Sequence, residues 1–246
     1  MRLMVFSDIH GNLPALERVL SHAADRNVHR YICLGDIVGY GPFPNECVER
    51  IRHLKNCRCV VGNHDVAALW EASPYGMNAS AKKAILWTMD RLTPESKDFL
   101  SGLPDRLDLF DMTFVHADPY NPRGWRYILE RKHALRSFAV SRFRNIFIGH
   151  SHRPLVITRN GLFRVALHTV SGTTEFPVSD ARRRIINCGS IGQPRDKDPR
   201  ACYLIYDSRR QRLEYHRVAY DTEQSAQAIY SAGLPERLGK RLLKGI

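Results

Sequence analysis

The sequence predicts an α/β or α+β protein in which two β-sheets pack together within a single domain spanning residues 1–246. Two observations predict this class. In the first third of the chain, short apolar runs alternate with amphipathic helical patterns, whereas after about residue 110 strand signals follow one another closely. The alternating part favours parallel strands with right-handed crossovers, and the later part favours a mainly antiparallel set.

The elements of the first third follow from hydrophobic spacing. Strands are expected at residues 2–6, 31–34 and 58–61, separated by helices at residues 14–25 and 45–55. In both helices the apolar residues recur every three or four positions, which places them on one face that can pack against a sheet.

The rest of the chain begins with helical patterns and continues with strands. Helices are expected at residues 78–92, 95–100 and 221–232. Asn160-Gly161 is a strong hairpin signal between two of the later strands. These strands are expected at residues 113–115, 145–148, 155–158, 162–166, 184–187, 202–207 and 213–218.

Composition and charge exclude some classes of protein. The chain is 43% hydrophobic and 25% charged, and it lacks an apolar run of about 18 residues, so we expect a cytoplasmic protein without membrane contact. Asp8 and His10 interrupt the N-terminus before the apolar core of a signal peptide could form. Without such a signal, the six cysteines are expected to be reduced thiols. The net charge of +12 favours anionic ligands, although the basic clusters are short and scattered.

Polar side chains that can bind metal follow five successive predicted strands. Ligands of open α/β sheets bind beyond the carboxyl ends of the strands, so these side chains are expected at one sheet edge. Each residue alone is more often a helix cap, a turn residue or a buried histidine than a ligand, but the repetition favours a site. The set comprises Asp8, His10, Asp36, Asn63, His116, His150 and His152.

The donor atoms of this set indicate which ions it would take. Two carboxylates, one amide oxygen and four imidazoles suit Mn²⁺, Fe, Zn²⁺, Ni²⁺ or Mg²⁺ rather than Cu(I) or an iron–sulfur cluster. Seven ligands are too many for one ion that must also hold a substrate. Two ions about 3.5–4 Å apart that share a carboxylate are therefore expected.

The order Asp-x-His, Gly-Asp, Gly-Asn-His-Asp, His, Gly-His-x-His resembles the calcineurin-like metallophosphoesterases, and residues 189–195 resemble a loop of small bacterial phosphoesterases in that superfamily. The resemblance implies a two-sheet β-sandwich flanked by helices, and two divalent ions with Mn²⁺ as the first choice. It also implies a division of the ligands: Asp8, His10 and His152 on one ion, Asn63, His116 and His150 on the other, and Asp36 bridging.

The same resemblance implies hydrolysis of a phosphate ester by attack of a metal-bridging hydroxide, with His64 protonating the leaving oxygen. The alternative for His64 is to orient Asn63. Protein phosphatases of the superfamily carry Asp and Arg where this chain has Gly39 and Tyr40. Loss of that Arg favours a small phosphodiester or nucleotide substrate, and Arg195 is either a substitute cation or a surface residue.

Three alternatives remain open. The chain could be a phosphomonoesterase or protein phosphatase that uses Arg195 or another cation as its clamp, or a catalytically weak scaffold of the same fold. A nucleic-acid binder rests on charge alone, because no aromatic-basic recognition motif is present, so nucleic acid is expected only as a nucleotide-type substrate. The oligomeric state and the role of residues 120–136, as a lid or as plain packing, are left undecided.

Overall fold

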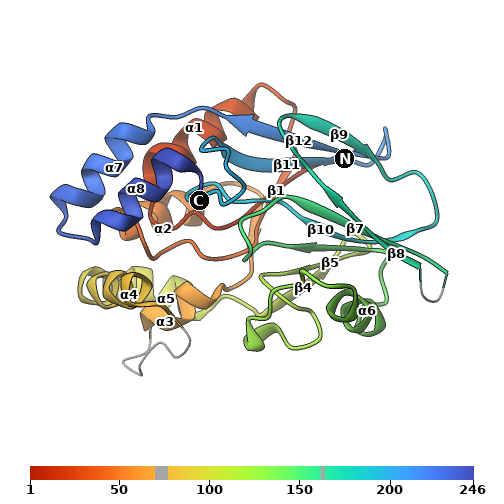
Figure 1. Ribbon diagram of the computed structural model, residues 1–246, viewed down its shortest axis with the longest axis horizontal. Helices are drawn as coiled ribbons and strands as arrows, with labels where there is room; N and C mark the ends of the chain where they lie inside the picture. The colour runs from red at the N-terminus through yellow and green to blue at the C-terminus, as the bar shows by residue number, and fades with distance from the viewer. Residues whose placement is uncertain (70–76, 162–163) are drawn as a thin grey trace.

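The computed structural model describes residues 1–69, 77–161 and 164–246 of the chain. This described part forms two mixed β-sheets of six strands each, which face one another and carry helices on their outer sides (Figure 1). The two-sheet architecture predicted from the sequence is confirmed.

The first sheet has the strand order β3-β2-β1-β11-β12-β9. β1 pairs in parallel with β2, and β2 with β3, as the alternating strand and helix patterns predict. β11 then pairs antiparallel with β1. The strands span Arg2–Phe6 (β1), Arg30–Cys33 (β2), Cys57–Cys59 (β3), Thr174–Pro177 (β9), Ala201–Asp207 (β11) and Arg212–Val218 (β12).

The second sheet has the order β4-β5-β6-β10-β7-β8, and in it β5, β6 and β10 are parallel. The hairpin predicted at Asn160-Gly161 joins the antiparallel pair β7 and β8, although Leu162 and Phe163 of the predicted strand lie outside the described residues. The strands span Arg106–Leu109 (β4), Met112–Val115 (β5), Asn145–Ile148 (β6), Leu155–Asn160 (β7), Arg164–Thr169 (β8) and Arg183–Asn187 (β10).

The central strands are apolar on both sides because each side is covered. In β1, Leu3 and Val5 pack between the two sheets, whereas Met4 and Phe6 pack toward the helices on the outer face. This pattern explains why β1 is an unbroken apolar run and does not alternate between polar and apolar residues. The core between the sheets fixes where their strand ends lie relative to one another.

Helices pack on three places. One group covers the outer face of the first sheet, α6 covers the second sheet through Ala134 and Phe138, and a third group packs around Tyr40. The helices span Leu13–Ala24 (α1), Pro44–Arg52 (α2), Asn63–Leu69 (α3), Ala79–Arg91 (α4), Pro94–Ser101 (α5), Arg131–Val140 (α6), Thr222–Ser231 (α7) and Glu236–Lys244 (α8), with a 3₁₀ turn at Pro122–Gly124.

Sequence reasoning missed five elements, namely α3, α6, α8, β4 and β9, and it extended α2 to residue 55 and β3 to residue 61. The sequence did not indicate α8 because Gly239, a poor helix former, interrupts its pattern of apolar and polar residues. In the structure a Cβ at Gly239 would lie 2.5 Å from the Tyr230 ring, so the glycine permits close contact between α7 and α8. Tertiary packing here outweighs local helix propensity.

Two further expectations concern thiols and membranes. All six cysteines are free, as predicted. None of the helices in the described ranges has the length and apolar character that a bilayer crossing requires.

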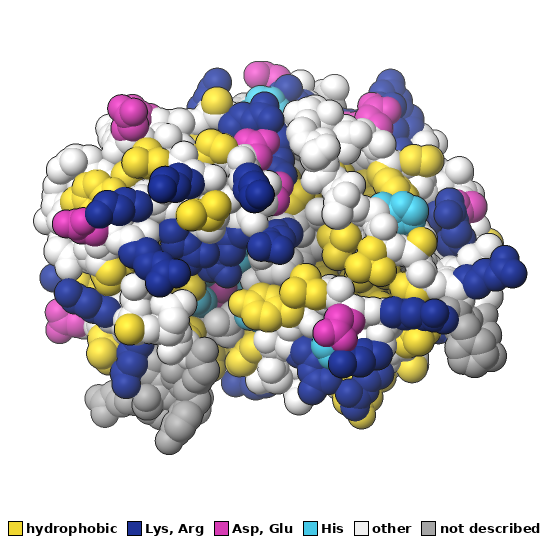
Figure 2. All heavy atoms as spheres, viewed as in Figure 1, with side chains coloured by type: hydrophobic (Ala, Val, Ile, Leu, Met, Phe, Trp, Pro, Cys, Tyr) yellow, Lys and Arg dark blue, Asp and Glu magenta, His cyan; other side chains and the backbone are white. Residues whose placement is uncertain are grey.

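The positive charge of the chain is visible on its surface. In the view of Figure 1, Figure 2 shows dark-blue Lys and Arg side chains spread over the molecule and gathered beside the central hollow below α8.

Candidate metal centre

The residues predicted to bind metal converge where the carboxyl ends of strands from the two sheets lie next to one another. The sequence predicts a single sheet edge, and this is wrong in one respect, because β1, β2 and β3 belong to the first sheet and β5 and β6 to the second. Hydrogen bonds join the two sets of strand ends. The main-chain N–H of His150 donates to Asp8 Oδ2 at 3.1 Å, and His116 Nδ1 lies 2.7 Å from the Leu34 carbonyl oxygen.

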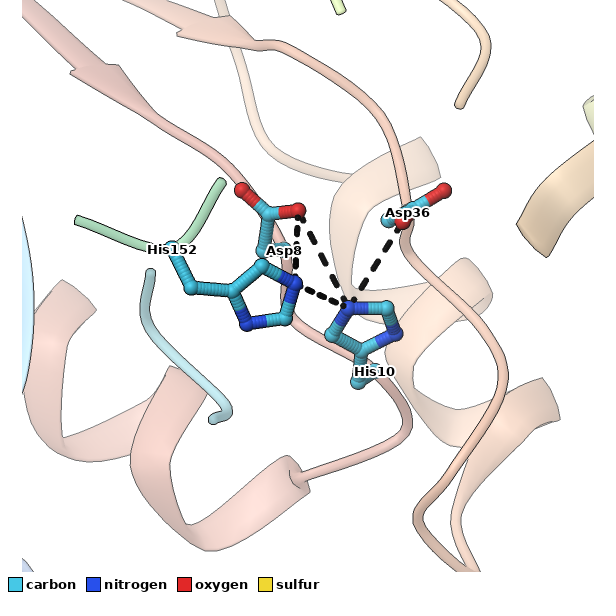
Figure 3. Close-up of side chains that lie close together, drawn as sticks. All are labelled: Asp8, His10, Asp36 and His152. Atoms are coloured by element: carbon cyan, nitrogen blue, oxygen red, sulfur yellow. Dashed lines mark hydrogen bonds and ion pairs between the residues drawn. The ribbon is translucent and has the colours of Figure 1, made fainter. Parts of the chain in front are cut away.

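Four buried side chains form the first group of possible ligands: Asp8, His10, Asp36 and His152 (Figure 3). One ligand atom from each lies within 4.8 Å of the others. His10 Nε2 is 3.2 Å from His152 Nε2 and 3.6 Å from Asp36 Oδ2, and His152 Nε2 is 3.3 Å from Asp8 Oδ1. The group is compact enough to surround a single ion.

The second group consists of Asp36, His116 and His150. His116 Nε2 lies 3.4 Å from Asp36 Oδ2, 3.2 Å from His150 Nδ1 and 3.1 Å from Asn63 Oδ1. Asp36 therefore belongs to both groups through the same oxygen. All seven side chains singled out from the sequence are brought together, in the two sets that the superfamily resemblance implies.

The four imidazoles share one arrangement, in which one ring nitrogen points at a main-chain carbonyl and the other faces the site. A carbonyl oxygen only accepts, so the nitrogen beside it carries the hydrogen, and a neutral ring presents its lone pair to the site. The N–H groups donate from His10 Nδ1 to Val38 O, His116 Nδ1 to Leu34 O, His150 Nε2 to Trp125 O and His152 Nδ1 to Gln193 O, at 3.2, 2.7, 2.8 and 2.6 Å.

Acceptor atoms therefore face acceptor atoms inside a buried site. The site-facing nitrogens of His10 and His152 are only 3.2 Å apart, and Asp8 Oδ1 is buried without a hydrogen-bond partner among the described residues. Such contacts are unfavourable unless a cation lies between the atoms. The donor set and its orientation fit divalent metal ions, and a carbonyl that holds the second nitrogen is the usual support of a metal-binding histidine.

The charge states agree with this arrangement. Burial lowers the pKa of His10 and of His152 well below the ordinary value, and that of His150 to about 3, so these rings are neutral at pH 7. Burial alone would lower the pKa of His116, but the Asp36 carboxylate raises it to about 9. In the metal-free protein this pKa favours a protonated His116 ring 3.4 Å from Asp36 Oδ2, and a metal ion held by these two residues would replace that proton.

The main chain is strained at five of these positions. Asp8, His10, Asp36, His150 and His152 have φ values of 56°, 53°, 51°, 64° and 58°, in the left-handed region that residues other than glycine seldom adopt. Such strain gathers at functional sites and persists only where surrounding bonds enforce it. Here the main-chain N–H groups of Asp8 and His10 donate to Gly35 O and Asp36 O, at 3.0 and 2.9 Å.

Asp65 is a positioning residue to which sequence reasoning assigned no role. Its Oδ1 accepts hydrogen bonds from the main-chain N–H groups of Ile37 and Val38, at 2.8 and 3.1 Å, and its Oδ2 accepts from that of Gly62, at 2.9 Å. It thereby ties the loop that carries Asp36 to the loop that carries Asn63. The only signal in the sequence is its place at the end of the Gly-Asn-His-Asp motif.

His64 lies beside the two groups without belonging to either. The ring is buried at the wall of the cavity, 4.7 Å from the His10 ring and 4.4 Å from the Tyr40 ring between centroids. A Cβ at Gly39 would lie 2.5 Å from His64 Nδ1, so the glycine makes room for the imidazole. Burial lowers the pKa of His64 to about 4.

Arg195 points into the same cavity, which has a volume of about 1110 Å³. One terminal nitrogen of its guanidinium donates to Gln193 Oε1 at 3.0 Å and to the Tyr40 hydroxyl at 3.3 Å. Its Nε is buried and has no hydrogen-bond partner in the described part of the chain. Arg195 is thus a half-buried cation beside the metal-ligand groups.

Part of the segment 120–136 covers the second group. The Trp125 carbonyl accepts the hydrogen of His150, and the Tyr127 ring stacks on the His150 ring at a centroid distance of 4.2 Å and an angle of 14°. These contacts orient a candidate ligand and form one wall of the cavity.

Comparison with known proteins identifies this arrangement. Residues 1–211 match the calcineurin-like phosphoesterase superfamily domain. The chain belongs to this superfamily. It is 39% identical over 250 residues to an uncharacterized protein of Methanocaldococcus jannaschii, a match that covers 99% of this chain and 98% of the relative.

Two other similarities agree. The crystal structure of a metallophosphoesterase from Sphaerobacter thermophilus superposes with a TM-score of 0.90 and 42% identity, covering 100% of this chain and 99% of that one. A shorter stretch of 42 residues, 17% of this chain and 23% of the relative, is 50% identical to the phosphodiesterase YfcE of Escherichia coli. Membership of a family of metal-dependent phosphoesterases supports a hydrolase.

Proposed function

We propose that this chain is a dinuclear metal-dependent phosphoesterase that hydrolyses a small phosphodiester or a nucleotide. The observation that carries the proposal is the orientation of the four imidazoles. Each is held by a main-chain carbonyl so that its other nitrogen faces the site. The neutral rings of His10 and His152 thereby bring two acceptor nitrogens within 3.2 Å of each other, which is unfavourable unless a cation binds between them.

Two cations fit better than one, because the ligands divide into two groups that share Asp36 Oδ2. We assign Asp8, His10 and His152 to one ion, Asn63, His116 and His150 to the other, and Asp36 to both. When bound, the ions supply positive charge against the phosphate oxygens and lower the pKa of a coordinated water. Mn²⁺ is our first candidate among Mn²⁺, Fe, Zn²⁺, Ni²⁺ and Mg²⁺.

His64 is assigned to the proton that the leaving oxygen requires. Its ring lines the cavity next to both groups, and its Nδ1 has no hydrogen-bond partner among the described residues. A phosphate anion bound beside the ring would raise the lowered pKa of His64, because a neighbouring negative charge favours the protonated imidazole. The geometry supports this role over the orientation of Asn63, since no bond between His64 and Asn63 side chains is present in the described structure.

The diester preference rests on two points. Tyr40 stands where protein phosphatases of the superfamily carry an arginine, which removes a bidentate clamp for a monoester. The likeness to the phosphodiesterase YfcE, although short, is in the same direction.

A phosphomonoesterase is the second candidate, and one observation favours it. The Arg195 guanidinium reaches the Tyr40 hydroxyl, so a cation from a distant loop lies close to the position of the missing arginine. Arg195 could therefore provide the clamp that Tyr40 cannot.

The test is a comparison of substrates with metal-analysed protein. We expect about two ions per chain and faster hydrolysis of bis-p-nitrophenyl phosphate than of p-nitrophenyl phosphate. Faster hydrolysis of the monoester would move the assignment to the second candidate. No turnover of either ester with Mn²⁺, Ni²⁺, Fe²⁺, Zn²⁺ or Mg²⁺ would leave the scaffold interpretation.

A further inference from the structure

The cavity above the metal-ligand groups has a second, basic wall that the phosphoester chemistry does not require. One side of the cavity is formed by Asn63, His64 and His150. The facing side is formed by α8 near the C-terminus, which contributes four cationic side chains: Arg237, Lys240, Arg241 and Lys244. Figure 2 shows the dark-blue side chains gathered here, next to the hollow.

Most of this charge is not neutralised by the protein. Lys240 pairs with Glu236 at 2.7 Å along the helix. By contrast, Arg237, Arg241 and Lys244 have no carboxylate side chain as an ion-pair partner within the described ranges, and neither does Arg195. Elsewhere on the molecule many arginines are paired with aspartate or glutamate, for example Arg182 with Asp180. The wall of the cavity is therefore a local excess of positive charge.

Arg241 lies at the centre of this excess. Its Nε donates to the main-chain oxygen of Ile246, and its two terminal nitrogens have no hydrogen-bond partner among the residues that the structure describes. Burial lowers the pKa of Arg241 to about 10, and the nearby charges of Arg195 and Arg237 act in the same direction. Cations crowded in this way are stabilised when an anion binds between them.

Arg195 connects this wall to the metal-ligand groups. Its main-chain N–H donates to the His152 carbonyl at 3.2 Å, and its guanidinium contacts Tyr40 and Gln193. Its buried Nε has no partner in the described structure. The positive charge thus continues from the metal-ligand groups, which form the floor of the cavity, to α8. Among the lining side chains of the described residues the one carboxylate is that of Glu236, which is paired with Lys240, and the oxygen of Ile246 that accepts from Arg241 lies at the same wall.

A single phosphodiester carries one negative charge, and two divalent ions would already neutralise it. The unpaired cations farther out therefore call for additional negative charge on the same ligand. We propose that the substrate carries a second, non-scissile phosphate group, and that Arg195, Arg237, Arg241 and Lys244 bind it. The ligand class is a small molecule with two or more phosphates. This inference rests on the proposed function, because it names the substrate class of that site.

The test compares ligands that differ by one phosphate. Thymidine 3′,5′-bisphosphate and thymidine 5′-phosphate are titrated calorimetrically into metal-loaded protein. We expect the bisphosphate to bind at least about tenfold more tightly, as a few charge-assisted hydrogen bonds provide, and the ratio to decrease as salt is raised. Equal affinities would overturn the proposal.

Variants locate the effect on α8. Arg241→Gln and Arg237→Gln should each lower the affinity ratio toward one, and Arg241→Lys should restore part of it. Arg237 is exposed, so its variant keeps the test valid if Arg241→Gln does not fold. The double variant Glu236→Gln and Lys240→Gln removes an ion pair from the same helix without changing its net charge, and should leave the ratio unchanged. An equal loss in this double variant would show that the ratio does not depend on the unpaired cations and would overturn the site.

Turnover separates this inference from the proposed function. The p-nitrophenyl ester of thymidine 5′-phosphate, with and without a 3′-phosphate, releases the same nitrophenol. A preserved affinity ratio without release from either ester would refute the phosphoesterase and retain the polyphosphate site. Release from both esters with an affinity ratio of one would retain the phosphoesterase and refute the site.

Discussion

The cavity has two charged regions that differ in construction: the metal-ligand groups at its floor, and the basic wall formed by α8 and Arg195. The floor consists of buried side chains at strand ends, and each imidazole is oriented by a carbonyl from another segment. The wall consists of exposed or half-buried cations, most of them on one helix and few of them paired. The floor places ligand atoms at defined positions, as the proposed metal binding requires. The wall spreads positive charge over a larger volume, as the proposed binding of an anionic ligand requires.

The largest effect on the floor is expected from a substitution of Asp36. Asp36→Asn removes the carboxylate whose Oδ2 faces both ligand groups, while its amide can still accept the hydrogen bond from the His64 main-chain N–H. We expect loss of bound metal and a loss of activity beyond the about 10²–10⁴-fold typical of one acid–base group. Metal analysis and initial rates measure both effects. Asp90→Asn, at an exposed carboxylate, is the matched control, and full occupancy of both ions in Asp36→Asn would disprove the bridging role.

A substitution of His64 tests whether a residue beside the metal-ligand groups contributes to catalysis without binding metal. His64→Asn should keep the metal content and lower kcat by at least about tenfold, because the leaving oxygen loses its proton donor. His53→Asn, at an exposed histidine, should change neither quantity. An unchanged kcat in His64→Asn would remove this residue from the mechanism.

The pH dependence of metal binding tests the charge state of the floor. Because the Asp36 carboxylate raises the pKa of His116 to about 9, this ring carries an extra proton in the metal-free protein below that pH. Metal must displace the proton, so affinity should rise with pH up to about 9, by about tenfold per pH unit for one proton. Calorimetry in buffers with different ionisation heats should show more protons released per chain at pH 8 than at pH 9.5, because a proton lost by a coordinated water is released at both pH values and the His116 proton mainly at the lower one. Equal release at the two pH values would contradict the assignment.

The smallest effect is expected at Arg195, which lies between the cations of α8 and the metal-ligand groups. Arg195→Gln should raise KM several-fold with little change in kcat and none in metal content, because a charge that binds substrate and transition state alike acts on KM. Arg200→Gln, an exposed arginine paired with Asp198, is the control. If Arg195→Gln loses metal, then Arg195 stabilises the metal-ligand groups, and its assignment to substrate binding alone is wrong.

Much of the fold and of the site could be predicted from local pattern. Leu3–Phe6 and Tyr203–Tyr206 are apolar on both faces, and this signal identifies central strands wherever they pair. The strand ends then carried Asp8, Asp36 and the histidines to one place. By contrast, α8 is short, basic and interrupted by Gly239. Its leucines at 238 and 242, together with Leu234 just before the helix, form an apolar face only against α4, α7 and Tyr40. The prediction that residues 1–246 form a single domain remains untested.

By itself, the sequence determined the kinds of donor atom in the site and the strand ends that carry them, because both depend on residues adjacent along the chain. Only the tertiary structure decided that these strand ends come from two sheets, which nitrogen of each imidazole faces inward, and that a C-terminal helix completes the cavity. The reason is physical. The carbonyls of Val38, Leu34, Trp125 and Gln193 belong to segments far from the histidines that they orient, and α8 lies across from the floor only once the core has formed.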